Sequence, residues 1–235
     1  MLFCVMGNSG SGKDTLIDSV IENSNKGVKK LRLVTYRPQR PNEIDDRYIF
    51  ATKYEFNKLL NDNKFVEFRS YKVANGDIWM YGTLQSEFNN AIDADTTYIT
   101  TCTPMQFTAY YNSLDESKLW RLHPIVLTMI SPKARLQRML QRIDDNYDSV
   151  KEVCRRFSDD EDAVDESKLL PKYCFPNNTE SDLVRNTDLI LQLAREINRH
   201  TRHYSDYLDM HSRTIKDTKL LAGFYREDNY NKEDK

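Results

Sequence analysis

The residues best suited to chemistry form a glycine-rich loop near the start of the chain. The loop reads Gly7, Asn8, Ser9, Gly10, Ser11, Gly12, Lys13, Asp14 and Thr15, with the spacing G-x-x-x-x-G-K. In such a loop, backbone N–H groups turn inward around a phosphate chain, and the following helix adds partial positive charge. The Lys13 ammonium then reaches the β- and γ-phosphates. The stretch predicts an ATP site, with Lys13 as a candidate catalytic residue.

One position of this loop departs from the usual pattern. Asp14 stands where a serine or threonine normally offers its hydroxyl to Mg²⁺. A carboxylate is a good ligand for this hard cation, so Asp14 is a possible ligand for the Mg²⁺ that accompanies ATP. An acid in the first turn also stabilises the positive end of a helix. The sequence leaves both roles open.

A second set of anion-binding side chains follows after the first helical pattern. Arg37 and Arg40 lie among the prolines at 38 and 41, and Tyr48 comes soon after them. Guanidinium groups make forked, charge-assisted hydrogen bonds to phosphate, and a phenol adds another donor. Two arginines at this spacing also occur in solvated turns, so the pattern alone only suggests a second phosphate site.

Strand and helix patterns alternate around these residues. Residues 2–6 are an apolar run typical of a buried parallel strand. Further apolar runs occur at 31–34, 97–102, 124–130 and 173–175, and helical patterns occur at 13–24, 104–113, 131–143 and 180–199. Such alternation implies an α/β fold with a parallel sheet flanked by helices. We therefore predict a P-loop kinase core.

Two segments interrupt this alternation. Residues 35–83 are rich in Arg, Tyr and Asp and contain strand-like pieces, which predicts an inserted acceptor-binding subdomain. Residues 144–168 are strongly polar, as expected for a helical lid that is exposed when open. The predicted division is a domain over 1–197, with its core at 1–34, 84–143 and 169–197, followed by a charged extension over 198–235.

Composition limits the classes of partner. The net charge is -2, so no global positive field favours nucleic acid, and no apolar run approaches the roughly 18 residues of a membrane span. The four cysteines form no C-x-x-C pair, which predicts reduced, buried thiols. We expect a cytoplasmic protein that binds small molecules, and the oligomeric state stays open.

Several later motifs make the sequence resemble the guanylate kinase family. That family carries T-T-R-x-x-R-x-G-E, Y-x-F, E-F, F-x-E-[WF] and Y-G-[TS] in this order. The corresponding residues here are Thr35 to Glu43, Tyr48 to Phe50, Glu55 with Phe56, Phe65 to Phe68, and Tyr81 to Thr83. The resemblance is strong over residues 2–83 and looser over the rest of 1–197.

The resemblance implies ATP-dependent phosphorylation of a nucleoside monophosphate, GMP or dGMP by default. It places Arg37, Arg40, Tyr48 and Tyr81 on the acceptor phosphate. It places Glu67 on the guanine N1–H and 2-amino groups, and Thr83 on the base edge. Arg138, Arg142 and Arg155 resemble lid arginines that act on the transferring phosphate, and Asn177 resembles part of a late turn beside ATP.

Two other interpretations stay open. Asp14 directly after the loop lysine resembles the ribose 1,5-bisphosphate kinases, which act on a sugar phosphate. Leu33, where guanylate kinases have a base-contacting serine, points the same way, and the strand at 98–102 lacks that family's acidic residues. The other alternative is a non-catalytic guanylate-kinase-like binding module, against which the intact loop and Lys13 argue.

Overall fold

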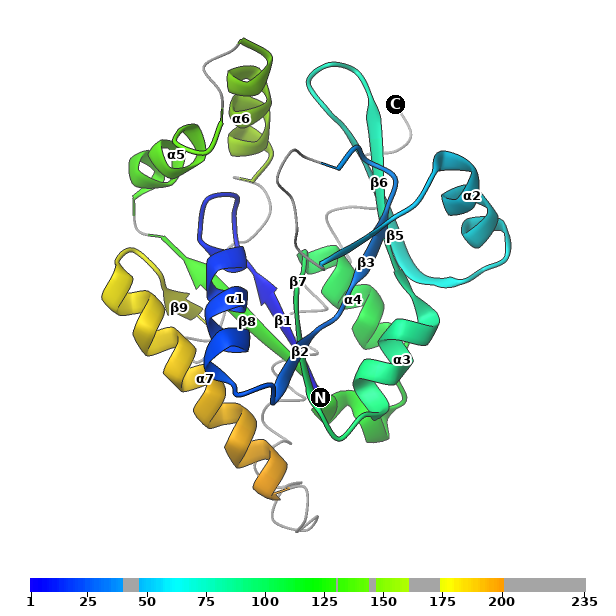
Figure 1. Cartoon of the computed structure of the whole chain (residues 1–235), viewed down its shortest axis with the longest axis vertical. Helices are drawn as coiled ribbons and strands as arrows, with labels where there is room; N and C mark the ends of the chain where they lie inside the picture. The colour runs from blue at the N-terminus through cyan, green and yellow to red at the C-terminus, as the bar shows by residue number, and fades with distance from the viewer. Residues whose placement is uncertain (40–46, 130, 144–146, 161–173, 201–235) are drawn as a thin grey trace.

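The computed structural model describes residues 1–39, 47–129, 131–143, 147–160 and 174–200, which contain two sheets (Figure 1). The larger sheet has five strands in the order β2-β7-β1-β8-β9, and every pair in it is parallel. Its strands are β1 (Leu2–Met6), β2 (Val28–Lys30), β7 (Thr97–Thr101), β8 (Leu122–Thr128) and β9 (Cys174–Pro176). The predicted parallel sheet is confirmed.

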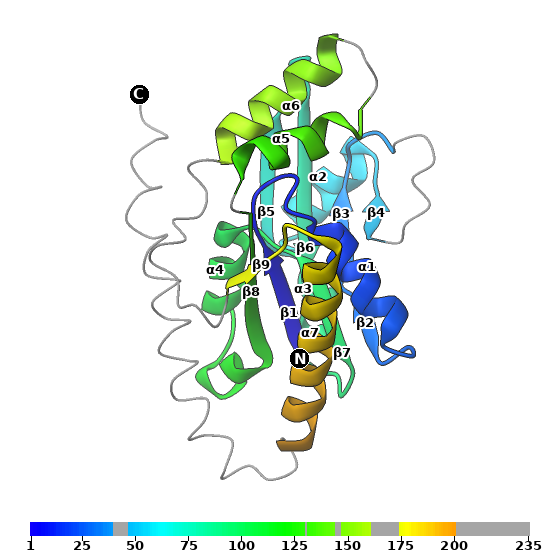
Figure 2. The same ribbon diagram turned by 90° about the vertical axis from the view of Figure 1, so that its left-hand side faces the viewer.

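The central strand β1 supplies side chains to both faces of this sheet because successive residues of a strand point in opposite directions. One face is covered by α1 (Lys13–Asn23) and α7 (Glu180–His200), and the other by α3 (Gln85–Asp93) and α4 (Pro104–Asn112) (Figure 2). Phe3 and Val5 pack toward α1 and α7, and Leu2, Cys4 and Met6 pack toward α3 and α4. This double burial explains why the strand reads as a continuous apolar run.

The second sheet has four strands in the order β4-β3-β6-β5. They are β3 (Leu33–Thr35), β4 (Tyr48–Phe50), β5 (Phe65–Lys72) and β6 (Ile78–Leu84), with α2 (Lys53–Asn61) between β4 and β5. β3 pairs parallel with β4, while β6 pairs antiparallel with β3 and β5. The apolar run at 31–34 therefore enters this sheet, and the core strand that precedes it is β2.

Two helices lie over the end of the core that carries the glycine-rich loop (Figures 1 and 2). They are α5 (Pro132–Leu140), capped by Ser131 as predicted, and α6 (Tyr147–Asp159). The Arg135 guanidinium of α5 lies 4.3 Å from the centre of the Phe157 ring of α6. The Glu152 carboxylate of α6 accepts a hydrogen bond of 2.9 Å from the Ala74 backbone N–H, between β5 and β6. These contacts connect the two helices with the second sheet.

A short 3₁₀ helix, η1, spans Glu116–Arg121 and completes the list of described elements. Among the described residues, none of the helices combines the length and apolar character that crossing a bilayer requires. All four cysteines are described: Cys4 and Cys102 are buried, Cys174 is half-buried and Cys154 is exposed. The prediction of buried thiols is therefore wrong for Cys154, which lies in α6.

Candidate functional site

The glycine-rich loop between β1 and α1 has a backbone that only glycine can supply at two positions. Gly7 and Gly12 have φ angles of 141° and 92°. A Cβ atom on Gly7 would lie 2.6 Å from the Leu127 carbonyl oxygen, and one on Gly12 would lie 2.5 Å from Nδ2 of Asn177. Any side chain at either position would distort the loop.

Lys13 folds back over this loop. Its Nζ atom donates hydrogen bonds to the backbone oxygens of Gly7, at 2.7 Å, and Asn8, at 3.0 Å. Burial lowers the pKa of the Lys13 amine, and the carboxylates of Asp14 and Asp160 oppose that shift. The amine thus lies against the backbone of the loop, and negative charge from a phosphate bound there would raise the pKa of Lys13.

Asp160, directly after α6, places a carboxylate in the same loop. Its Oδ2 atom accepts a hydrogen bond of 2.5 Å from the Ser9 backbone N–H. With the Asn8 amide oriented to suit both neighbours, its nitrogen donates to the Asp160 carbonyl at 3.3 Å and its oxygen accepts from Arg135 at 2.5 Å. The Asp160 carboxylate therefore uses a loop N–H group that a phosphate oxygen would use. Sequence reasoning placed Asp160 only in a polar segment and missed this contact.

Replacing Asp160 with alanine is expected to tighten ATP binding by about 5- to 10-fold. The Asp160 carboxylate and the ATP phosphates compete for the same loop N–H groups. The apparent Kd for ATP therefore rises as the fraction of protein with a free loop falls. Calorimetric Kd values for ATP and for inorganic tripolyphosphate measure the effect. Asp188→Ala, at an exposed position of α7, makes the same charge change away from the loop. Unchanged or weaker binding in Asp160→Ala would contradict this expectation.

Asn177, predicted to lie beside ATP, contacts the glycine-rich loop directly. Arg138, a predicted lid residue, contacts the turn that contains Asn177. Nδ2 of Asn177 donates to the Ser11 carbonyl at 2.7 Å, and the Asn177 side chain is buried. The Arg138 guanidinium donates to the carbonyls of Asn177, at 3.0 Å, and Asn178, at 2.5 Å. In this arrangement Arg138 orders the turn after β9.

The other two predicted lid arginines, Arg142 and Arg155, differ in what they contact. Arg155 pairs with Glu152 at 2.7 Å and with Asp159 at 2.5 Å, both on its own helix. Arg142 is exposed just after α5, and its charge contributes to the lowered pKa of Lys13. Arg135, which was not predicted as a site residue, is the arginine that contacts the loop. Its signal in the sequence was its position three residues before Arg138, on the same helix face.

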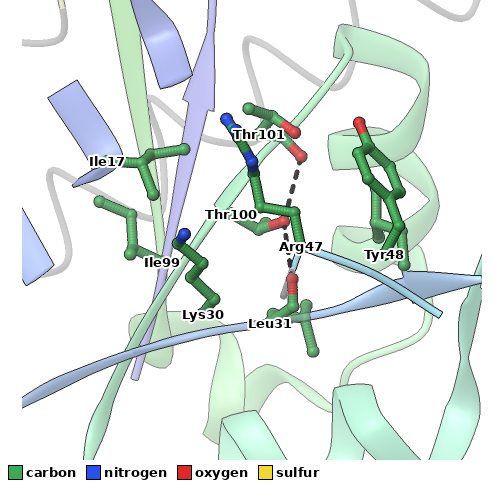
Figure 3. A pocket seen from close by; sticks show the side chains of 9 residues that line it. Ile17, Lys30, Leu31, Arg47, Tyr48, Ile99, Thr100 and Thr101 are labelled. Atoms are coloured by element: carbon green, nitrogen blue, oxygen red, sulfur yellow. Dashed lines mark hydrogen bonds between the residues drawn. The ribbon is translucent and has the colours of Figure 1, made fainter. Parts of the chain in front are cut away.

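Asp14 forms an ion pair that sequence reasoning did not foresee. Its Oδ1 atom lies 2.9 Å from Nη1 of Arg47, and the Asp14 side chain is 55% exposed. Figure 3 shows Arg47 and Tyr48 at a narrow pocket that also includes Ile17 and Thr100 of the core. The ion pair thus joins the start of α1 to the beginning of β4.

Asp14→Ser is expected to retain turnover but to raise the Mg²⁺ concentration needed for the half-maximal rate, because serine is a weaker ligand than a carboxylate. The Asp14 carboxylate is half-exposed and Arg47 is 24% exposed, so loss of this partly solvated ion pair should lower stability by about 1 kcal/mol. A Mg²⁺ titration of turnover measures the shift. Arg47→Met removes the same pair but keeps the carboxylate, so it separates the two effects. A titration unchanged in Asp14→Ser would favour the helix-terminus role.

Three of the predicted acceptor-phosphate residues lie together on the second sheet. Arg37 is buried, and its guanidinium lies 4.9 Å from the Tyr48 ring centre and 5.1 Å from that of Phe50. The rings of Tyr48 and Tyr81 are 5.9 Å apart. Burial and the charge of Asp14 raise the pKa of Tyr48, which keeps its phenol protonated as a donor. Arg40 lies outside the described residues.

Glu67 belongs to a polar network between β5, β6 and α4. Its side chain is 7% exposed. Its carboxylate accepts hydrogen bonds from Thr83 at 2.6 Å and from Arg69 at 2.9 and 3.1 Å. Thr83 and Gln106 also bond to the Tyr110 hydroxyl, each at 2.6 Å. Burial alone would lower the pKa of Arg69, but the Glu67 carboxylate raises it.

The parallel sheet and the glycine-rich loop after its central strand define a P-loop α/β protein with the kinase fold. A family model described as guanylate kinase matches residues 2–167. The chain belongs to the guanylate kinase family. This assignment confirms the resemblance identified from the sequence.

Individual relatives match over parts of the chain. A guanylate kinase of Streptococcus pneumoniae is 33% identical over 94 residues, which cover 40% of this chain and 43% of that protein. One of Mycoplasma genitalium is 26% identical over 154 residues, which cover 64% and 59% of the two proteins. The chain thus spans less than half the length of the first of these curated relatives. In fold, it is similar to the guanylate kinase of Anaplasma phagocytophilum, with a TM-score of 0.54, 17% identity and coverage of 83% and 86%.

Proposed function

We propose that this protein transfers the γ-phosphate of ATP to the phosphate of a guanine nucleoside monophosphate, GMP or dGMP. The observation that carries the proposal is a short series of contacts between two anion-binding groups. Lys13 and Asp14 begin α1, Asp14 pairs with Arg47, and the adjoining Tyr48 ring contacts Arg37. A donor phosphate at the loop and an acceptor phosphate at Arg37 would therefore be neighbours.

The chemistry needs positioning and charge neutralisation more than proton transfer. The acceptor phosphate is already ionised near neutral pH, so its oxygen can attack the γ-phosphorus without a general base. The new P–O bond forms as the bond to the bridging β,γ-oxygen breaks, and ADP leaves. Lys13 and the loop N–H groups would bind the donor phosphates, while Arg37, Arg40, Tyr48 and Tyr81 would hold the acceptor.

In this proposal the helices over the loop, α5 and α6, exclude water during transfer. Arg135 already contacts Asn8 of the loop, and Arg142 lies close enough to affect the Lys13 amine. In this proposal Arg142 and Arg155 turn toward the transferring phosphate when ATP replaces Asp160. Exclusion of water from a closed site would favour transfer over ATP hydrolysis.

Mg²⁺ is expected to arrive with ATP, where it neutralises charge on the β- and γ-phosphates. The candidate protein ligand is Asp14, whose half-exposed carboxylate lies beside the loop and pairs with a cation, the Arg47 guanidinium. A hard oxygen ligand at this position fits Mg²⁺. In the part of the chain that the structure describes, no group of three or more His, Cys, Asp or Glu side chains offers a metal site made by protein alone.

The proposal keeps the expected division of the chain. The second sheet begins at Leu33 and ends at Leu84, close to the predicted acceptor subdomain at 35–83. The helix α6 lies within the predicted lid at 144–168. The helix α7 ends at His200, so most of the predicted extension over 198–235 lies outside the described residues. We expect the enzyme to work in the cytoplasm, where ATP is available.

An ATP-consumption assay over a panel of acceptors tests the proposal. The panel contains GMP, dGMP, AMP, CMP, UMP and ribose 1,5-bisphosphate, with identification of the phosphorylated product. GMP or dGMP should stimulate ADP formation well above the rate without acceptor. Stimulation by ribose 1,5-bisphosphate alone would favour the sugar-phosphate alternative, and no stimulation by any acceptor would favour a binding module.

A further inference from the structure

Arg69 forms hydrogen bonds to the Glu67 carboxylate, the group that the proposed function assigns to binding the base. One nitrogen of Arg69, Nη1, donates to both oxygens of Glu67, at 3.1 and 2.9 Å. A second nitrogen, Nε, donates to the Tyr71 hydroxyl at 3.1 Å, and the guanidinium lies 5.8 Å from the Tyr81 ring centre. The third nitrogen, Nη2, makes no hydrogen bond to any residue that the structure describes. Arg69 thus has donors left for a ligand beside Glu67.

The number of acceptor positions on Glu67 limits what a base can do there. A carboxylate offers about four lone-pair positions. Arg69 uses one on each oxygen, and Thr83 uses another on Oε1. About one position remains, on Oε2. Guanine presents two donors to such a carboxylate, N1–H and the 2-amino group, so both cannot bind unless Arg69 leaves.

Departure of Arg69 from Glu67 would be unfavourable. The two side chains are 18% and 7% exposed, and they are the only opposite charges that meet within this network of described residues. Separating such a pair leaves an uncompensated charge in a poorly solvated site. A base that fits around the intact pair is therefore preferred over one that disrupts it.

We propose that Glu67 and Arg69 together bind the base and select 6-oxopurine monophosphates, whether or not the base carries a 2-amino group. This inference rests on the proposed function. Oε2 of Glu67 would accept the base N1–H, and Nη2 of Arg69 would donate to the adjacent O6. Hypoxanthine presents this edge as well as guanine does. Adenine reverses it, with an amine facing Arg69 and an unprotonated nitrogen facing Glu67, so it is rejected.

Steady-state kinetics with GMP, IMP and AMP test this specificity. In the wild type, kcat/KM for GMP and IMP should agree within about threefold, and AMP should be at least about 100-fold poorer. Arg69→Met frees the carboxylate for the 2-amino group, so the GMP/IMP ratio should rise to about 10-fold or more. Lys72→Ala, at an exposed position of the same strand, removes a positive charge away from Glu67 and should leave the ratio unchanged.

The GMP/IMP ratio does not depend on how much of a variant is folded, because both substrates report on the same active molecules. A wild type that prefers GMP over IMP by about 30-fold or more would overturn the inference, as would a ratio unmoved by Arg69→Met. In both cases GMP is still phosphorylated and the proposed function stands. A wild type that phosphorylates no purine monophosphate would instead overturn the proposed function, and this inference with it.

Discussion

Lys13→Ala is expected to lower kcat by at least about 100-fold while the protein remains folded. A positioned cation that neutralises charge on the transferring group is worth about 3 to 4 kcal/mol in comparable sites. In the structure, the Lys13 amine donates hydrogen bonds to the backbone oxygens of Gly7 and Asn8 within the loop. No other lysine among the described residues forms hydrogen bonds to the loop.

The fold should survive this substitution because the loop is held by its backbone and by Asn177. Asn177 contacts the Ser11 carbonyl, and glycine dihedrals set the path of the chain, so neither depends on the lysine. Thermal unfolding should therefore change little, and kcat should fall at saturating GMP and ATP. Lys58→Ala, at an exposed position of α2, gives the same charge change as a control. Near-normal turnover in a folded Lys13→Ala protein would exclude phosphoryl transfer at this loop.

The parts of the fold that could be predicted are those specified by contiguous residues. The loop at 7–15 fixes its own shape through its glycines, and β1 and α1 follow from uninterrupted patterns on either side of it. The helix α5 was predicted at its first residue because Ser131 and Pro132 form a local start signal. The boundary between the two sheets was not predicted at 31–34, since buried apolar residues occur on both sides of it and only Leu31 and Arg32 separate β2 from β3.

The parts of the site that were missed depend on distant pairs. Ser9 meets Asp160 across 151 positions, and no local pattern specifies that contact. The pairing of Asp14 with Arg47 likewise depends on how the second sheet is placed against the core. The contact between Glu67 and Arg69 is different, because residues two apart on a strand share a face and an acid and a base there attract each other. That signal was present in the sequence.

Together these pairs show that several charged side chains of the candidate site contact partners within the protein. Asp160 accepts a hydrogen bond from the Ser9 N–H of the glycine-rich loop, Asp14 pairs with Arg47, and Arg69 pairs with Glu67. In the proposed function, ATP must therefore replace Asp160 at the loop, whereas the base binds around the intact Glu67–Arg69 pair. Such exchange lowers apparent affinity, and it favours ligands that restore each displaced interaction.

Glu67→Gln is expected to lower kcat/KM for GMP by about 30- to 1000-fold. The substitution preserves the shape of the side chain but turns one accepting oxygen into a donor, which then faces the Arg69 donors or the base N1–H. Losing a charge-assisted hydrogen bond and leaving a buried donor unpaired costs roughly 2–4 kcal/mol. The loss should be confined to the acceptor, because the proposed function puts ATP at the loop and the acceptor phosphate near Arg37.

Three measurements separate this effect from a structural one. The Kd for ATP should be unchanged, the melting temperature should fall because Arg69 loses its charged partner, and kcat/KM should fall for GMP and dGMP. Glu55→Gln, in the exposed capping box of α2, makes the same chemical change outside the site and should affect only stability. A kcat/KM for GMP within about threefold of wild type would show that no base contacts Glu67. If ribose 1,5-bisphosphate were then the better acceptor in both proteins, the second sheet would be a sugar-phosphate site, with the Glu67–Arg69 pair serving only to hold β5.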